Sequence, residues 1–349
     1  MLKQSEILIS GALLTIVLIV ISSFSAEGRK RNSPAATADK VVIAYVTSWK
    51  DTRVNPEYLT HINYAFGHVT DSFDGVRIDN PKRLSKIVKL KKKYPHLKVI
   101  LSIGGWGSGN FSEMAADSLN RLSFAKDCAA KVKQYSLDGI DIDWEYPTSS
   151  VAKISSHPAD TQNYTKMMRD IRMAIGPYKI LSQATSALAK YIDFEAVEPY
   201  VDYTNVMSYD LGWAPYLNSP LYKSENVEHI SADDAVNLHL AAGIPADKLV
   251  MGLAFYGRGE KGFPRSRDLT EAHLTKGGYT FHWDNEAMVP YLTNSAGQLA
   301  FGYENESSLA LKCEYILSKG LKGAMYWSYD GDNESGDLLR TVFITLNED

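Results

Sequence analysis

The amino-acid sequence predicts an α/β fold, a (β/α)8 TIM barrel with a small α+β insertion between the seventh and eighth strands. Short β-rich runs alternate with helical stretches from residue 41 onward, which is the pattern of a parallel sheet with helical crossovers. Eight such runs occur over about 310 residues, and a barrel typically needs ~250 residues plus insertions. A doubly wound open sheet is the alternative, although it usually needs fewer strands.

The predicted strands cover residues 41–46, 61–66, 98–103, 139–144, 180–184, 203–209, 249–256 and 323–328. The connection between residues 256 and 323 is longer than one crossover requires, and residues 278–283 within it have a strand pattern. This predicts the insertion at about residues 259–305. The connection after the fourth strand, residues 146–160, is also long. Both loops are expected at the C-terminal face of the barrel, where active sites are built.

The helices between these strands carry start and stop signals. Asn80 precedes Pro81 at a first helical position, residues 231–234 form a capping box, and Gly320 closes a helix that begins near Ser307. One more helix is predicted from an apolar face at helical spacing, which consists of Leu122, Ala125, Cys128, Ala129, Val132 and Tyr135.

The N-terminal region predicts export from the cytoplasm. Residues 7–24 form an almost uninterrupted apolar run, so residues 1–26 are expected to be a cleaved signal peptide or a membrane anchor, with cleavage favoured. Residues 27–39 are polar and are predicted to be a linker, which leaves residues 40–349 for the barrel. The protein is therefore expected to be secreted or periplasmic, or alternatively anchored in a membrane with the barrel outside the cytoplasm.

Composition excludes some functions. The net charge of −4 provides no excess of positive charge for a phosphate backbone, so nucleic acid is not an expected partner. Cys128 and Cys313 cannot form a disulfide framework and are expected to be free and buried. The 21 Tyr and 6 Trp residues provide rings with one polar edge, which suit a carbohydrate surface. We expect a monomer.

Three acidic residues share one side of the fourth predicted strand. Side chains alternate along a strand with a period of two, so Asp141, Asp143 and Glu145 point the same way and the apolar residues between them point the other. In a barrel the acidic side is then the interior, near the C-terminal end of the strand. Buried like charges cannot all ionise, so at least one pKa is expected to be raised and a proton shared. A carboxyl group becomes a general acid near neutral pH in this way.

Other chemistries are less well supported. Alternating carboxylates can also bind a cation, but none of the eight histidines shows metal-ligand spacing, and no metal or organic cofactor is expected. The sequence has no G-x-S-x-G motif for a serine nucleophile. Residues 104–109 are rich in glycine but lack the third glycine of a G-x-G-x-x-G phosphate loop. We interpret them as a tight turn that carries an aromatic residue into a cleft.

These motifs resemble those of glycoside hydrolase family 18, the chitinases and related enzymes. Residues 138–147, DGIDIDWEYP, are similar to the family's D-x-x-D-x-D-x-E signature on the fourth strand. Residues 101–106 resemble its S-x-G-G motif on the third strand, residues 207–210 its motif on the sixth, and residues 324–328 its eighth-strand segment with a tryptophan. The resemblance covers nearly all of residues 41–346 in the family's order.

The resemblance implies a retaining, substrate-assisted mechanism. Glu145 would protonate the glycosidic oxygen and later deprotonate the attacking water. The acetamido oxygen of the sugar, and not a second carboxylate, would attack the anomeric carbon and form an oxazolinium ion. Asp143 would orient the acetamido group, Asp141 would share its proton, and Tyr209 would hold the acetamido oxygen.

The resemblance also implies a set of substrate-binding residues, which are Tyr45, Phe66, Ser102, Gly105, Trp106, Asp210, Trp213 and Trp327. Trp327 would lie under the reacting sugar, and Tyr45 and Ser102 would donate hydrogen bonds to Asp141. Trp106 and Trp213 are candidate stacking platforms for neighbouring sugars, with core packing as the alternative. The insertion is shorter than in deep-grooved relatives, so a shallow, open cleft is expected.

The resulting hypothesis is an endo-acting hydrolase of chitin or other glycans that contain β-1,4-linked N-acetylglucosamine. Two alternatives remain at this point. An endo-β-N-acetylglucosaminidase that cuts the chitobiose core of N-glycans would share the catalytic geometry, although the segment at residues 144–147 favours the chitinase branch. A chitin-binding lectin would share the fold, but the presence of Glu145 argues against it.

Overall fold

The computed structural model describes residues 33–269 and 275–348, and the statements below concern these residues. The apolar run at residues 7–24, which predicts a signal peptide or an anchor, lies outside them. Among the helices of the described residues, none combines the length and the apolar character needed to cross a bilayer.

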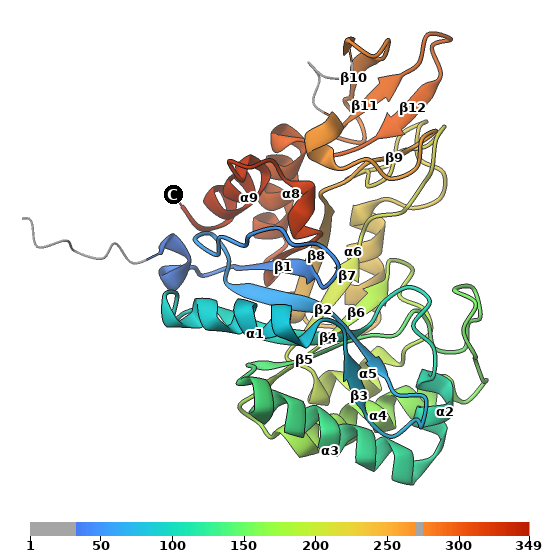
Figure 1. The fold of residues 1–349 in the computed structure, drawn as a ribbon. Helices are drawn as coiled ribbons and strands as arrows, with labels where there is room; N and C mark the ends of the chain where they lie inside the picture. The colour runs from blue at the N-terminus through green and yellow to red at the C-terminus, as the bar shows by residue number, and fades with distance from the viewer. Residues whose placement is uncertain (1–32, 270–274, 349) are drawn as a thin grey trace, which may run out of the picture. The chain divides into compact units, whose positions relative to one another are not determined.

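Eight parallel strands close into a barrel, which confirms the predicted fold class (Figure 1). The strands are β1 (Val41–Thr47), β2 (His61–Val69), β4 (Lys98–Gly104), β5 (Gly139–Asp143), β6 (Ile180–Ser186), β7 (Tyr203–Met207), β8 (Leu249–Ala254) and β13 (Gly323–Trp327). They follow one another in this order around the barrel, and pairing of β13 with β1 completes the ring. The sheet has one further strand that was not predicted, the short β3 (Val76–Ile78). β2 runs on to Val69, and its end pairs with β3 in antiparallel orientation.

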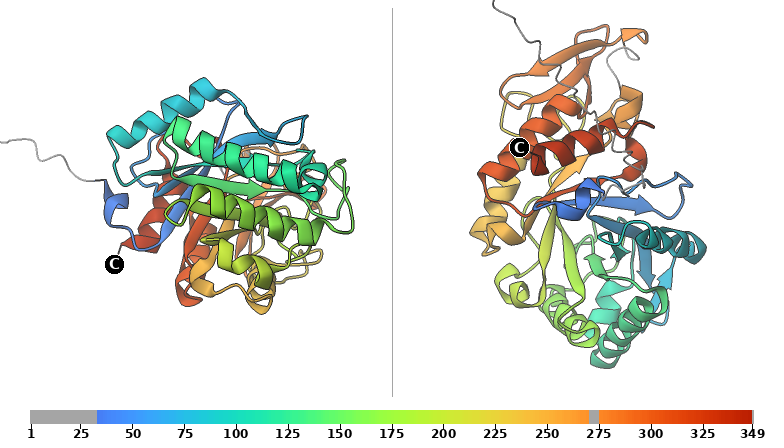
Figure 2. Two further views of the ribbon diagram at one scale, coloured as in Figure 1. Left: turned by 90° about the horizontal axis from the view of Figure 1, so that it is seen from below. Right: turned by 90° about the vertical axis from the view of Figure 1, so that its left-hand side faces the viewer.

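Helices surround the barrel, as the view along its axis in Figure 2 shows. The α-helices are α1 (Pro81–Lys89), α2 (Phe111–Ala116), α3 (Ser118–Tyr135), α4 (Asp160–Ile175), α5 (Phe194–Val197), α6 (Ala232–Ala241), α8 (Glu306–Ser318) and α9 (Asp337–Asn347). The 3-10 helices are η1 (Pro34–Thr37), η2 (Leu90–Lys92), η3 (Glu198–Tyr200), η4 (Ala246–Lys248), η5 (Ser266–Leu269) and η6 (Tyr329–Gly331). The predicted caps are present, since the Asn80 side chain accepts from the Arg83 amide, and Ser231 and Asp234 form a capping box.

The predicted apolar face of α3 was wrong at one position. Leu122 is 56% exposed, whereas Ala125, Cys128 and Val132 are buried as expected. Arg121 takes the inward position at the start of this stripe, because its guanidinium has a buried partner in the next helix. Both cysteines, Cys128 included, are buried and free.

A second sheet lies between β8 and β13 in the chain, at the top of Figure 1. It is antiparallel, has four strands in the order β10-β11-β12-β9, and packs around a small apolar core of its own. Its strands are β9 (Arg258–Gly259), β10 (Thr280–Asp284), β11 (Val289–Thr293) and β12 (Leu299–Gly302).

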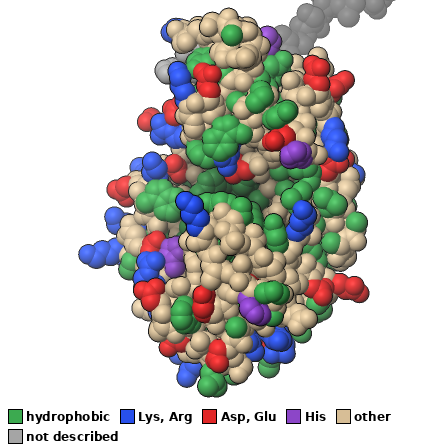
Figure 3. All heavy atoms as spheres, turned by 90° about the vertical axis from the view of Figure 1, so that its right-hand side faces the viewer, with side chains coloured by type: hydrophobic (Ala, Val, Ile, Leu, Met, Phe, Trp, Pro, Cys, Tyr) green, Lys and Arg blue, Asp and Glu red, His purple; other side chains and the backbone are tan. Residues whose placement is uncertain are grey.

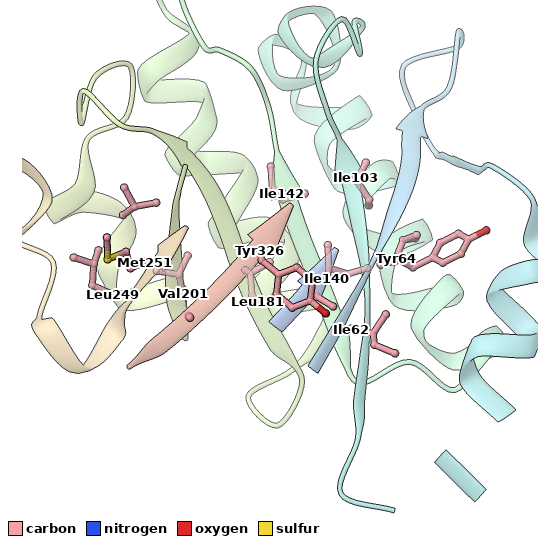
Figure 4. Packing of buried hydrophobic residues seen from close by; sticks show 14 of the residues in the cluster. Ile62, Tyr64, Ile103, Ile140, Ile142, Leu181, Val201, Leu249, Met251 and Tyr326 are labelled. Atoms are coloured by element: carbon pink, nitrogen blue, oxygen red, sulfur yellow. The ribbon is translucent and has the colours of Figure 1, made fainter. Parts of the chain in front are cut away.

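The alternation of side chains along the barrel strands separates two apolar layers. Outward-facing residues such as Ile62, Ile140 and Leu181 pack in the large cluster between the strands and the helices (Figure 4). Inward-facing residues such as Tyr45 and Met325 form a smaller cluster inside the barrel. Because Ile140 and Ile142 of β5 face outward, Asp141 and Asp143 face the interior.

A buried ion pair joins three of the surrounding helices. Arg121 of α3 donates to the carboxylate of Asp170 in α4 at 3.3 Å and to the carbonyl oxygen of Ala115 in α2 at 2.7 Å. The side chains of Arg121 and Asp170 are 9% and 5% exposed. Loss of one member of such a pair leaves the other charge buried without its partner, which is strongly destabilising.

We expect Asp170→Asn to lower the free energy of unfolding by about 3 kcal/mol, because the variant keeps the shape of the side chain but removes the charge that faces Arg121. Urea denaturation of the variant and the parent measures this difference. Glu314→Gln, at an exposed position on α8, is the control and should leave stability nearly unchanged. Equal stability of all three proteins would show that water already compensates Arg121.

Candidate active site

Asp141 lies fully buried inside the barrel and accepts four hydrogen bonds. Tyr45 Oη and Ser102 Oγ donate to Oδ2 at 2.9 and 2.8 Å, and Ser182 Oγ and Asn205 Nδ2 donate to Oδ1 at 2.6 and 3.2 Å. Burial raises the pKa of Asp141, and these hydrogen bonds oppose the rise. The contacts of Tyr45 and Ser102 were expected. Those of Ser182 and Asn205 were missed, although both occupy inward positions of predicted strands.

Asp143 lies next on the same side of β5. It is 4% exposed, and its Oδ1 atom has no hydrogen-bond partner among the residues that the structure describes. Burial raises the pKa of Asp143 well above its usual value, and the nearby Glu145 and Asp141 raise it further. A neutral carboxyl group at this position can donate as well as accept a hydrogen bond.

Glu145 is the second residue beyond the end of β5 and is only partly buried. Burial raises the pKa of Glu145 to about 7, the charge of Asp210 adds to this shift, and a hydrogen bond with Tyr146 opposes it. Glu145 is thus half protonated near neutral pH, which suits a general acid and base. Tyr146 was not among the predicted site residues.

A cavity of about 1030 Å³ opens above these acids at the C-terminal ends of the strands. Figure 3 looks onto this face and shows a hollow along which hydrophobic side chains gather. Predicted site residues that line the cavity are Tyr45, Phe66, Trp106, Asp143, Glu145, Tyr209, Asp210, Trp213 and Trp327. Asp141, Ser102 and Gly105 are not part of its lining.

Gly105 lies outside the cavity lining but contacts two residues that form it. Its amide donates to the carbonyl oxygen of Asp143 at 2.8 Å, and a Cβ atom at this position would lie 2.6 Å from the ring of Phe66. Its φ of +93° is also a conformation that favours glycine. Gly105 therefore allows the loop after β4 to approach both β5 and an aromatic residue of the cavity.

Three aromatic rings lie together on one part of the cavity wall. Phe66 and Trp327 are stacked, with ring centroids 5.7 Å apart and an angle of 16° between the rings. Trp49, 59% exposed, lies 6.3 Å from each of them. Trp49 was not among the predicted site residues, although its place just after a barrel strand puts it at the C-terminal face.

Trp106 and Trp213 are exposed rather than part of the core. Their exposed fractions are 63% and 44%, so core packing is wrong as the alternative for both. One part of Trp213 is already in contact with protein, because the Arg258 guanidinium lies 4.4 Å from its ring centroid and 3.9 Å from that of Phe263. Trp106 contacts the ring of Tyr146 edge-on at 6.5 Å.

The carboxylate of Asp210 is held by two neighbours that were not predicted. Tyr256 Oη donates to Asp210 Oδ1 at 2.5 Å, and Arg258 forms an ion pair with the same carboxylate. The ring of Tyr256 also contacts that of Tyr209 edge-on at 6.1 Å. Both partners follow β8, a strand whose C-terminal end was expected at the site, but their pairing with Asp210 depends on contacts between loops.

Asp138, at the other end of β5, has a different environment. Its carboxylate accepts from the Val99 amide at 2.8 Å and from Lys91 Nζ at 2.6 Å. These bonds tie β5 to its neighbour and place Asp138 away from the cavity. Across residues 33–269 and 275–348, no group of three His, Cys, Asp or Glu side chains is arranged to hold a metal ion.

Known proteins provide a separate line of evidence. The model of the family "Glycosyl hydrolases family 18" matches residues 41–332. Chitinase A1 of Niallia circulans is 29% identical over 91% of this chain and 60% of its own length. Probable chitinase 2 of Drosophila melanogaster is also 29% identical, over 93% of this chain and 78% of its own length. The chain therefore spans less than two thirds of the first of these relatives.

Two solved structures are similar over nearly the whole barrel. A family 18 N-acetylglucosaminidase from Paenibacillus barengoltzii has a TM-score of 0.80 at 32% identity, covering 88% of this chain and 100% of that chain. Chitinase ChiA74 from Bacillus thuringiensis has a TM-score of 0.80 at 26% identity, covering 88% of this chain and 70% of that chain. Together with the acidic strand inside the closed barrel, these matches show that the chain belongs to glycosyl hydrolases family 18.

Proposed function

We propose that this protein is a chitinase that cleaves β-1,4 linkages between N-acetylglucosamine units by a retaining, substrate-assisted mechanism. The observation that carries the proposal is the pair of carboxyl groups at the C-terminal end of β5, beneath an aromatic cavity. Glu145 has a pKa of about 7, and Asp143 has an unpaired buried oxygen. The names of the relatives support a substrate that contains N-acetylglucosamine.

The two carboxyl groups have different tasks in this mechanism. Glu145 donates its proton to the glycosidic oxygen and then removes a proton from the incoming water. Asp143, which burial keeps largely neutral, is poorly suited to attack the sugar as an anion. Its unpaired oxygen accepts the N–H of the 2-acetamido group and turns the acetamido oxygen toward the anomeric carbon. Asp141 takes up the proton that Asp143 releases as positive charge develops on the oxazolinium ring.

The aromatic residues of the cavity bind the sugar rings. Trp327, stacked against Phe66, provides a flat apolar face under the reacting sugar. Tyr209 and Asp210 reach the acetamido group and the sugar hydroxyls. We further propose that the protein acts outside the cytoplasm, with residues 1–26 as a signal peptide or an anchor, residues 27–39 as a linker and residues 40–349 as the barrel.

Release of reducing ends from chitin oligosaccharides, compared with release of glycan from a glycoprotein, tests the proposed substrate. Cleavage of the oligosaccharides supports a chitinase. Release of glycan from the glycoprotein alone would instead favour an endo-β-N-acetylglucosaminidase, and binding without cleavage would favour a lectin.

Glu145→Gln and Asp143→Asn should fail in different ways. Without the acid, cleavage of chitin oligosaccharides should fall by at least ~10²- to 10⁴-fold, while an aryl glycoside with an acidic leaving group should keep part of its activity. Asp143→Asn should slow both substrates, because formation of the oxazolinium ion accompanies the departure of either leaving group. Steady-state kinetics on both substrates measures this, with the exposed Glu286→Gln as control.

The same mechanism requires an N-acetyl group on the reacting sugar. Fully deacetylated oligomers should therefore not be cleaved. Efficient cleavage of such oligomers, or a covalent sugar ester trapped on Asp141 or Asp143, would contradict the mechanism and favour an ordinary two-carboxylate glycosidase.

The pH dependence of kcat/KM should show the titration of Glu145. The acid acts in its protonated form, so activity should fall as the pH rises through about 7, the pKa of Glu145. Asp210→Asn removes a charge that raises this pKa, so this limb of the profile should move to lower pH. A limb at the same pH in both proteins would rule out the influence of Asp210.

Replacement of Trp327 should weaken sugar binding. Trp327→Ala removes the stacked face and should cost about 1–3 kcal/mol of binding free energy. This range is the one found for nucleic-acid bases that stack on aromatic side chains. Isothermal titration calorimetry with a chitin oligosaccharide on the inactive Glu145→Gln background measures the loss. Trp327→Phe keeps an aromatic face and should recover part of it, whereas equal affinity of all variants would place Trp327 outside the binding site.

A further inference from the structure

A buried ion pair lies behind the loop that carries Tyr209 and Asp210. Lys312 of α8 pairs with Glu304, and both side chains are 0% exposed. Lys312 Nζ donates to the Glu304 carboxylate, to the carbonyl oxygen of Ser219 and, at 2.8 Å, to Ser219 Oγ. Three donors thus meet three acceptors, and Ser308 Oγ donates to the second oxygen of Glu304 at 2.6 Å.

Stability alone does not explain this pair. Two charges removed from water lose much of their hydration, and apolar residues of similar volume often stabilise a protein equally well. This pair differs from a purely stabilising one because Lys312 also binds the carbonyl oxygen and the hydroxyl group of Ser219. Ser219 belongs to the segment after β7, which returns to the cavity.

Ser219 and its neighbour fasten the chain on both sides of Tyr209. Ser219 Oγ donates to the carbonyl oxygen of Ser208 at 2.7 Å. The side-chain oxygen of Asn218 accepts from the amide of Asp210 at 3.1 Å. The bonds from Lys312 to Ser219 therefore hold the carbonyl of Ser208, next to Tyr209, through one further hydrogen bond. They also fix the position of the adjacent Asn218, which binds the amide of Asp210.

Asp210 needs such support. Its φ of +58° lies in the left-handed region, which a residue other than glycine rarely adopts unless its surroundings hold it there. In this conformation its carboxylate meets Tyr256 and Arg258 at the cavity wall. Release of residues 218 and 219 would let the backbone of Asp210 relax and would move the carboxylate.

We propose that Lys312, together with Glu304, is a positioning residue for Tyr209 and Asp210, acting through Ser219 without touching the substrate. Neither Lys312 nor Glu304 lines the cavity. The proposal rests on the proposed function, because it assigns the pair to the same reaction. The pKa of Glu145, measured from the pH profile, can test this proposal. The charge of Asp210 raises this pKa only while Asp210 stays near Glu145.

The test is the double variant Lys312→Met with Glu304→Gln, which removes both charges and leaves neither unpaired. With the fold intact by circular dichroism, kcat/KM on a chitin oligosaccharide should fall by roughly 10- to 100-fold, as expected for displaced site residues. The alkaline limb of the pH profile should also move to lower pH. A purely structural role would lower the melting temperature and leave the limb in place.

The matched control is the other buried pair, Arg121→Met with Asp170→Asn, between helices on the outside of the barrel. This variant should lose stability but keep the limb of the parent. An equal shift in the control, or no shift in the Lys312 variant, would overturn the proposal.

Ser219→Ala provides a second test that keeps the ion pair. It removes the hydroxyl that links Lys312 to Ser208, so it should shift the limb in the same direction by a smaller amount. If the Lys312 variant fails to fold, an unshifted limb in Ser219→Ala overturns the proposal. Failure of the proposed function is distinguishable, because the parent protein itself would then release no reducing ends.

Discussion

The hydrogen bonding of one buried carboxylate is the constraint on which the structure depends. Asp141 accepts from residues of β1, β4, β6 and β7, and only a closed barrel brings four such strands to one point. Without these donors, a charge at this depth would be too costly to bury. Closure of the barrel and the placement of the acids are therefore consequences of the same contacts.

Three chemically similar groups then lie at different depths, two on β5 and the third two residues beyond its end. Asp141 is surrounded by donors, Asp143 lies at the cavity floor with an oxygen left unpaired, and Glu145 reaches the part that solvent can enter. A rise of two residues along a strand is about 6.6 Å, so each group meets a different environment. The strand and the two residues after it in this way provide a carboxyl group held by four donors, a largely neutral partner and an exchangeable proton.

The sequence was sufficient for features that depend on local periodicity. The alternation along residues 139–144 placed the acids inside, and strand ends located the site at the C-terminal face. Features that depend on contacts between distant segments could not be predicted. The pairing of Arg258 with Asp210 and the hold of Lys312 on Ser219 connect loops whose spacing in the chain carries no periodic signal. Arg121 shows a third limit, because its burial depends on a partner in another helix and displaced Leu122 from the expected face.

The inserted sheet is fastened to the barrel near both of its ends. Near the start of the sheet, Arg258 pairs with Asp210 at the cavity wall. Just beyond the end of the sheet, Glu304 pairs with Lys312 of α8. Its own apolar core lies between these two points and involves neither pair. Between these two points the sheet also holds the segment after β7, because Ser224 and Asn226 donate to the Asp284 carboxylate at 2.8 and 2.9 Å. A graft that deepens or flattens the groove therefore has to keep Asp284 as well as the two ion pairs.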